Sequence, residues 1–312
     1  MNNLLKKTLV LPVLALLLVH GAVRASAVQQ ASFASPEEAI AALIAALEKN
    51  DVATLGTLLG PDSEDVLSSG DEVADANARA DFVASFKTKH ALVPEGSSSM
   101  TLVVGDDDWP LPIPIVEKDG KWYLDGAAGA DELVYRRIGH NELGAIAVCR
   151  GFIDAQLEYA SAGHDGNEPG IFAAKLRSDP GRQNGLYWPS AEGEPQSPAG
   201  EAVARAAAEG YKAVTGKRKP YHGYYYRMLF AQGTNANSGA VEYFVDGQLT
   251  QGIALLAWPA DYAASGIMSF MVNEEGVVYQ KDLGEDTAAV AETIQVFDPD
   301  GSWEIVDSES DS

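Results

Sequence analysis

The order in which helical and strand patterns follow one another most constrains the fold of this chain. Ser35 and Glu38 form a capping box around Pro36, and an apolar stripe at helical spacing follows them. Two further helices are predicted at 51–59 and 77–90, and three strands at 100–104, 111–118 and 121–125. Helices that precede an antiparallel sheet, instead of alternating with its strands, are typical of an α+β fold.

The same order recurs after residue 130. We predict helices at 131–138 and 141–161 separated by a break at Gly139, with a long loop at 163–200. The buried face of the long helix is expected to carry four aliphatic side chains, Leu143, Ile146, Ile153 and Leu157. A further helix is predicted at 199–211, and strands at 223–230, 240–245, 253–258, 267–272 and 277–281. This part therefore predicts a long helix packed on a second antiparallel sheet.

The first 27 residues are predicted to be a secretory signal peptide. Lys6 and Lys7 precede an apolar run that is too short to span a membrane, and Ala25 and Ala27 flank Ser26 at a cleavage site. We expect a periplasmic or extracellular mature chain without a transmembrane anchor. The predicted organisation is a signal peptide at 1–27, an N-terminal α+β module at 28–130, a second α+β module at 131–306 and a disordered acidic tail at 307–312.

Composition excludes several classes of partner and cofactor. The formal net charge of −23 at pH 7 disfavours binding to nucleic acid and to anionic membrane surfaces. Cys149 is the single cysteine, so no intrachain disulfide forms, and its apolar surroundings predict a buried, unreactive thiol. No spacing typical of a zinc or cofactor site occurs. The acidic turns at 106–108 and 298–300 lack the spacing of a calcium loop, but calcium binding stays an open alternative.

Two parts of the chain resemble known folds. The element order of the N-terminal module resembles the cone-shaped nuclear-transport-factor-2-like fold, in which a curved sheet wraps a helix. The segments N-E-L-G-A-I-A at 141–147 and A-Q-L-E-Y at 155–159, with a late hairpin at 266–279, resemble the globular domain of type IV pilins and pseudopilins. Pilins begin with an apolar assembly helix, whereas residues 28–138 stand in its place here. The resemblance therefore implies a pilin-like sheet and does not imply pilus assembly.

The whole mature chain resembles an uncharacterised family of secreted bacterial proteins, the family of domain of unknown function 2950. The matching segments are G-D-D-D-W-P-L-P-I-P at 105–114, R-R-I-G-H-N-E at 136–142 and Y-Q-K-D-L-G at 279–284. This resemblance implies a location in the cell envelope and supplies no reaction.

The densest polar cluster comprises Arg136, Arg137, His140 and Glu142, where the first sheet ends and the long helix begins. Two guanidinium groups can hold a carboxylate or phosphate, and a His–Glu pair can exchange protons. The alternative, which we favour, is that one arginine pairs with a carboxylate and clamps the two modules together. Trp109, which precedes a proline, is predicted to form a wall of the same binding site or a packed corner.

The sequence favours a non-enzymatic envelope protein that acts through contacts with envelope proteins or polymers. Motifs of serine hydrolases, phosphate loops, zinc proteases and dinucleotide enzymes are all missing from the sequence. The alternative is a small-molecule-binding protein or hydrolase that uses a cavity in the N-terminal module. An apolar pocket of several hundred Å³ with a few convergent polar groups would favour this alternative.

Overall fold

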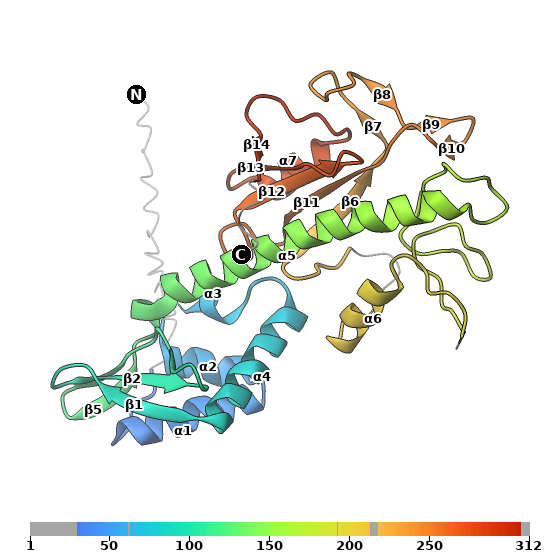
Figure 1. Cartoon of the computed structure of the whole chain (residues 1–312). Coiled ribbons are helices and arrows are strands. Elements are labelled where there is room, and N and C mark those ends of the chain that lie inside the picture. Colours follow the sequence, from blue (N-terminus) through green and yellow to red (C-terminus); the bar gives the residue numbers. More distant parts are fainter. Residues whose placement is uncertain (1–29, 62, 192, 213–217, 307–312) are drawn as a thin grey trace, which may run out of the picture.

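The computed structural model describes residues 30–61, 63–191, 193–212 and 218–306. The predicted signal peptide at 1–27 and the predicted acidic tail at 307–312 lie outside the described residues. Two α+β units lie on opposite sides of one long helix, α5 (Gly126–Ala162), with the N-terminal unit below it and the second sheet above it in Figure 1. Within the described part of the chain, no helix is both long and apolar enough to cross a membrane.

The N-terminal unit packs four helices against a small antiparallel sheet. Its helices are α1 (Pro36–Glu48), α2 (Val52–Leu59), α3 (Glu64–Leu67) and α4 (Glu72–Thr88). Its strands are β1 (His90–Pro94), β2 (Ser99–Val104), β3 (Trp109–Pro110), β4 (Ile115–Lys118) and β5 (Lys121–Leu124). The sheet order is β1-β2-β4-β5, with β3 paired to β2. The predicted helices-then-sheet order is therefore present.

Local sequence signals explain several of these elements. Ser35 Oγ accepts from the Glu38 amide at 3.2 Å, as a capping box requires. Asp119 and Gly120 both have positive φ and form the two-residue turn between β4 and β5. Prolines in the predicted strand 111–118 would favour an edge position, but β4 is not an edge strand, because it pairs with β2 and β5. Pro112 and Pro114 precede β4 and so remove no hydrogen bond from its ladder.

The second unit is built on a five-stranded antiparallel sheet. Its strands, in spatial order, are β14 (Glu304–Ile305), β13 (Val278–Asp282), β12 (Met268–Asn273), β11 (Ala254–Pro259) and β6 (Tyr224–Leu229). Two-stranded pairs add β7 (Ala231–Gln232) with β8 (Val241–Glu242), and β9 (Phe244–Val245) with β10 (Gln248–Leu249). The predicted strand at 240–245 therefore lies outside the large sheet, divided between β8 and β9. Helices α6 (Gly200–Ala208) and α7 (Thr287–Thr293) complete the unit.

Helix α5 packs on β11 and β12 and also contacts α3 of the N-terminal unit. The predicted break at Gly139 is wrong, because α5 is continuous through it. A glycine inside a helix costs only about 1 kcal/mol relative to alanine, and packing at both ends of α5 outweighs this cost. The helix also runs through the predicted module boundary at 130, so both units share it.

The predicted buried face of α5 is only half right. Ile146 and Ile153 are buried, whereas Leu143 and Leu157 are 52% and 47% exposed. The residues at the centre of the buried face are Ala145, Cys149, Phe152, Gln156 and Tyr159. The true face is therefore turned by about one residue, or about 100°, from the predicted one. Cys149 is fully buried, and burial raises the pKa of its thiol to about 12.

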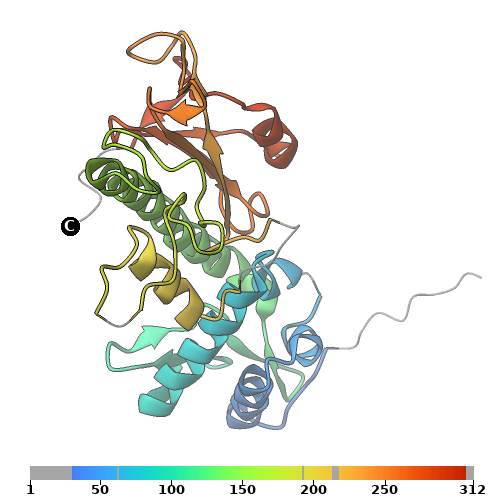
Figure 2. The same ribbon diagram turned by 90° about the vertical axis from the view of Figure 1, so that its right-hand side faces the viewer.

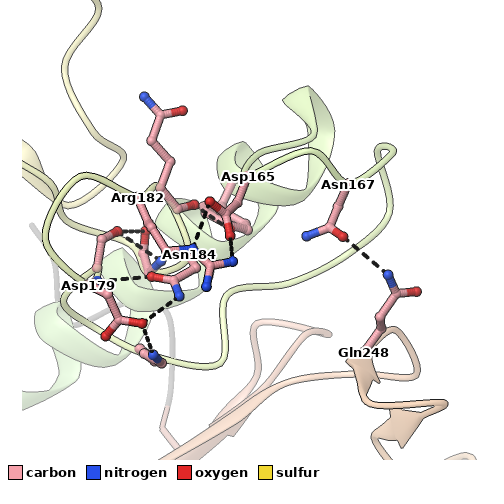
Figure 3. Close-up of polar contacts among 11 residues, drawn as sticks. Asp165, Asn167, Asp179, Arg182, Asn184 and Gln248 are labelled. Atoms are coloured by element: carbon pink, nitrogen blue, oxygen red, sulfur yellow. Dashed lines mark hydrogen bonds and ion pairs between the residues drawn. The ribbon is translucent and has the colours of Figure 1, made fainter.

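The stretch from 163 to 199 is largely irregular, as predicted, and polar contacts hold it in place (Figure 3). Arg182 pairs with Asp165, and its guanidinium holds the pKa of that carboxyl below the ordinary value. Asn184 donates to Asp179 at 2.8 Å, and Gln248 donates to Asn167 at 3.2 Å. The first two contacts lie within the loop, and the bond from Gln248 ties the loop to the β9–β10 pair.

Candidate functional site

A cleft of about 540 Å³ opens in the N-terminal unit beside α5. Its apolar walls come from α1, α2, α3, α4, the segment 109–113 and α5, and include Leu43, Leu55, Val66, Phe82, Trp109 and Leu133. Its polar lining comes from α4, α5, the segment after α6 and the residue before Gly223, and includes Asp81, Arg136, His140, Glu209, Tyr211 and His222. Figure 2 shows α6 beside α4, where Asn77 donates to the Glu209 carbonyl at 2.9 Å. Both units therefore contribute to the cleft.

Four of the five predicted site residues line this cleft, namely Trp109, Arg136, Arg137 and His140. Glu142 lies on α5 but is not part of the lining. Its Oε1 accepts from the Ile267 and Met268 amides, each at 3.0 Å. Glu142 therefore ties α5 to the start of β12 and does not face His140 as a proton-exchange partner.

Arg136 and Trp109 form one wall of the cleft together. The Arg136 guanidinium lies 4.9 Å from the centre of the Trp109 ring, which is a favourable cation–π distance. Its Nε donates to Glu132 Oε1 at 2.6 Å, one helical turn away. Phe82 meets Trp109 edge-on, with ring centres 6.1 Å apart. These contacts place a charged group over an aromatic surface.

Arg137 contacts both units, but not through the carboxylate that the clamp hypothesis expected. Its Nε donates to the Ala264 carbonyl at 2.8 Å, in the loop before β12. Its terminal nitrogens donate to the Val66 carbonyl at 3.4 Å and to the Asp65 carbonyl, both on α3. The expected carboxylate partner is therefore replaced by backbone carbonyls. Burial lowers the pKa of Arg137 below its ordinary value, but the side chain stays charged because arginine remains protonated in proteins.

Asp71 forms a second connection, which sequence reasoning missed. It is 2% exposed and caps α4 by accepting from the Val73 and Ala74 amides, each at 3.1 Å. Its other oxygen accepts from the Tyr211 hydroxyl at 2.9 Å and from the Gly223 amide at 3.0 Å. Asp71 and Tyr211 are 140 residues apart, so only the local capping signal was visible in the sequence.

At the end of the cleft near the second unit, several polar side chains are hydrogen-bonded to one another. His222 Nε2 lies 2.8 Å from Glu209 Oε2, and the His222 amide donates to the Tyr211 hydroxyl at 3.2 Å. Burial raises the pKa of Tyr211, so this hydroxyl stays protonated and can donate to Asp71. Gly223 has a φ of +75°, and an added Cβ would lie 2.4 Å from the Asn141 amide nitrogen. A glycine is therefore required where this segment meets α5.

The described residues show no cluster of three or more His, Cys, Asp or Glu side chains placed to hold a metal ion. In the first acidic turn Asp108 pairs with Lys89 at 2.7 Å. In the second, Asp298 accepts from the Asn235 amide at 2.7 Å, and Asp300 accepts from the Ser302 amide at 2.9 Å. These three carboxylates therefore all have partners within the chain.

Comparison with known proteins supports one of the three resemblances described above, the one to the family of domain of unknown function 2950. A family model described as Protein of unknown function (DUF2950) matches residues 30–306 of this chain. No curated protein and no solved structure gives a significant match. The matched range includes every residue that lines the cleft.

Proposed function

The chain belongs to the DUF2950 family, whose description names no reaction, and we propose from the cleft that it binds a small, mainly apolar molecule. The observation that carries this proposal is a cavity of about 540 Å³ with leucine and aromatic walls and a few polar groups. Small-molecule sites typically enclose about 300–1,000 Å³ with this composition. The function that the sequence analysis kept as the alternative is therefore the one that the site supports best.

The lining favours binding over covalent catalysis. Its described residues include no serine, threonine, cysteine or lysine that could act as a nucleophile. The Tyr211 hydroxyl is bonded to Asp71, and His222 is bonded to Glu209. Tyr211 thus links the two units through Asp71, and the His222–Glu209 pair lies within the second unit.

Filling the cleft should abolish binding. Ala78, on α4, lines the cleft, and we expect Ala78→Phe to weaken binding of 1-octanol at least about tenfold, because the ring occupies space that the alkyl chain needs. Calorimetric titration of the protein and of the variant with 1-octanol measures the two affinities.

Ala80→Phe is the matched control for this experiment. Ala80 is also an exposed alanine on α4, but it lies about 200° around the helix from Ala78 and does not line the cleft. The Ala80 variant should bind like the unmodified chain. Equal octanol affinity of the two variants would contradict binding in this cleft.

We further propose that the protein acts outside the cytoplasm, after cleavage of a signal peptide at 1–27. The basic start, the apolar run and the small residues before Val28 support this location. Sequencing of the exported chain should find an N-terminus at Val28 or within two residues of it. A mature chain that retains the apolar run would exclude the proposal.

The contact role expected for a pilin-like envelope protein has one observation in its favour. Tyr135, Leu143 and Leu157 are exposed apolar side chains at separate positions along α5, and exposed apolar surface can serve protein contacts. We keep contacts with envelope proteins as a second candidate function. Loss of a co-purifying envelope protein after Leu143→Asp would support it, whereas unchanged association would exclude this face.

A further inference from the structure

Most charged side chains of the cleft already have partners. Arg79 donates to Asn50 and to the Leu67 carbonyl, while Arg137 donates to three carbonyl groups. Glu209 is paired with His222 at 2.8 Å. A polar ligand therefore has to be recognised by the lining groups that keep free hydrogen-bonding capacity.

Arg136 and His140 are exposed lining residues of α5 that keep unengaged N–H donors. Only Nε of Arg136 is engaged, by Glu132 at 2.6 Å, which leaves the N–H groups of both terminal nitrogens available. His140 is exposed and has no hydrogen bond or ion pair within the described part of the chain. The two residues are four positions apart on α5, so their side chains lie on the same face.

The surroundings of these donors suit an amphipathic molecule. The Arg136 guanidinium lies over the Trp109 ring, and Leu133 precedes it by one turn on the same wall. An acidic group bound by Arg136 would thus lie at the border between charged and apolar surface. Asp81, on the facing helix α4, would repel an anion, so the acidic group belongs on the α5 side.

We propose, on the basis of the binding function above, that the ligand is an amphipathic carboxylate. Its carboxylate accepts hydrogen bonds from Arg136 and His140, and its hydrocarbon part lies against Trp109, Phe82 and Leu133. Arginine offers paired N–H donors that match a carboxylate, which favours this head group over a neutral alcohol.

Octanoate and 1-octanol test this proposal, because they share a chain length and differ in the head group. At pH 8 octanoate is ionised. We expect the unmodified chain to bind octanoate more tightly than octanol. Arg136→Met should weaken octanoate binding about tenfold, the smaller effect expected for hydrogen bonds to a charged group, and should weaken octanol binding clearly less than octanoate binding. His140→Gln should act in the same direction.

Arg205→Met provides the control. Arg205 is also an exposed arginine paired with a glutamate one helical turn away, Glu201, but it does not line the cleft. Its variant should bind both compounds normally. Equal binding of octanoate and octanol, with no effect of Arg136→Met, would overturn the carboxylate proposal and leave the binding function intact. Failure of both compounds to bind would overturn both.

Discussion

Asp71→Ala should lower the free energy of unfolding by about 4 kcal/mol, the largest effect that we expect from a single substitution. Loss of a helix cap costs about 0.5–2 kcal/mol, and each buried donor left without an acceptor costs about 1–3 kcal/mol. The substitution removes the cap of α4 and leaves the Tyr211 hydroxyl and the Gly223 amide without their acceptor. In a chain of this size, the melting temperature should fall by about 8–12 °C.

Asp51→Ala is the control for this prediction, because it removes a helix cap without removing a contact between the two units. Asp51 caps α2 through Thr54, at 3.0 Å to its amide, and makes no contact with the second unit in the described structure. Its substitution should lower the melting temperature by about a quarter as much as Asp71→Ala. Similar shifts for the two variants, measured by circular dichroism, would mean that the contacts of Asp71 with Tyr211 and Gly223 contribute little.

Arg137→Met should cost about 2–3 kcal/mol of unfolding free energy. The substitution keeps the aliphatic stem but removes the hydrogen bonds to α3 and to Ala264. A hydrogen bond from a charged donor contributes about 1.5–3 kcal/mol, and water replaces part of this because the side chain is only half-buried. Denaturant titration of the variant measures the loss.

Arg136→Met is the neighbouring control for this clamp. Arg136 is exposed and makes an i,i+4 pair with Glu132, so its removal should change stability by no more than about 0.5 kcal/mol. The two arginines are adjacent in sequence, and their variants carry the same new side chain. Equal effects on stability would refute the assignment of the clamp to Arg137.

Elements with strong local signals could be predicted from the sequence. The capping box at Ser35 and the turn at Asp119 and Gly120 act within a few residues, so they specify α1 and the β4–β5 hairpin directly. The face of α5 could not be predicted in the same way. Aliphatic side chains suggested Leu143 and Leu157, whereas the buried face also includes small and polar residues such as Ala145 and Gln156. Gln156 is buried because Ala173 satisfies both ends of its amide.

The residues of the candidate site also differ in how far their positions could be predicted from the sequence. Arg136, Arg137 and His140 lie within five residues of the sequence, so their proximity could be expected even though the predicted helix break at Gly139 is wrong. Asp71 and Tyr211 meet only because the second unit folds back onto α4, and no local pattern encodes that contact. Glu142 was predicted to belong to this cluster, yet it accepts hydrogen bonds from the amides of Ile267 and Met268 at the start of β12 instead.

Calorimetric titration with a series of straight-chain alcohols, from 1-butanol to 1-octanol, tests the central claim most directly. A buried methylene contributes about 0.8 kcal/mol, so each added carbon should raise the affinity about fourfold while the chain still fits the cleft. The Ala78→Phe variant should lose this dependence on chain length. An affinity that does not change with chain length, or a dependence that survives in the Ala78→Phe variant, would contradict an apolar ligand site in this cleft.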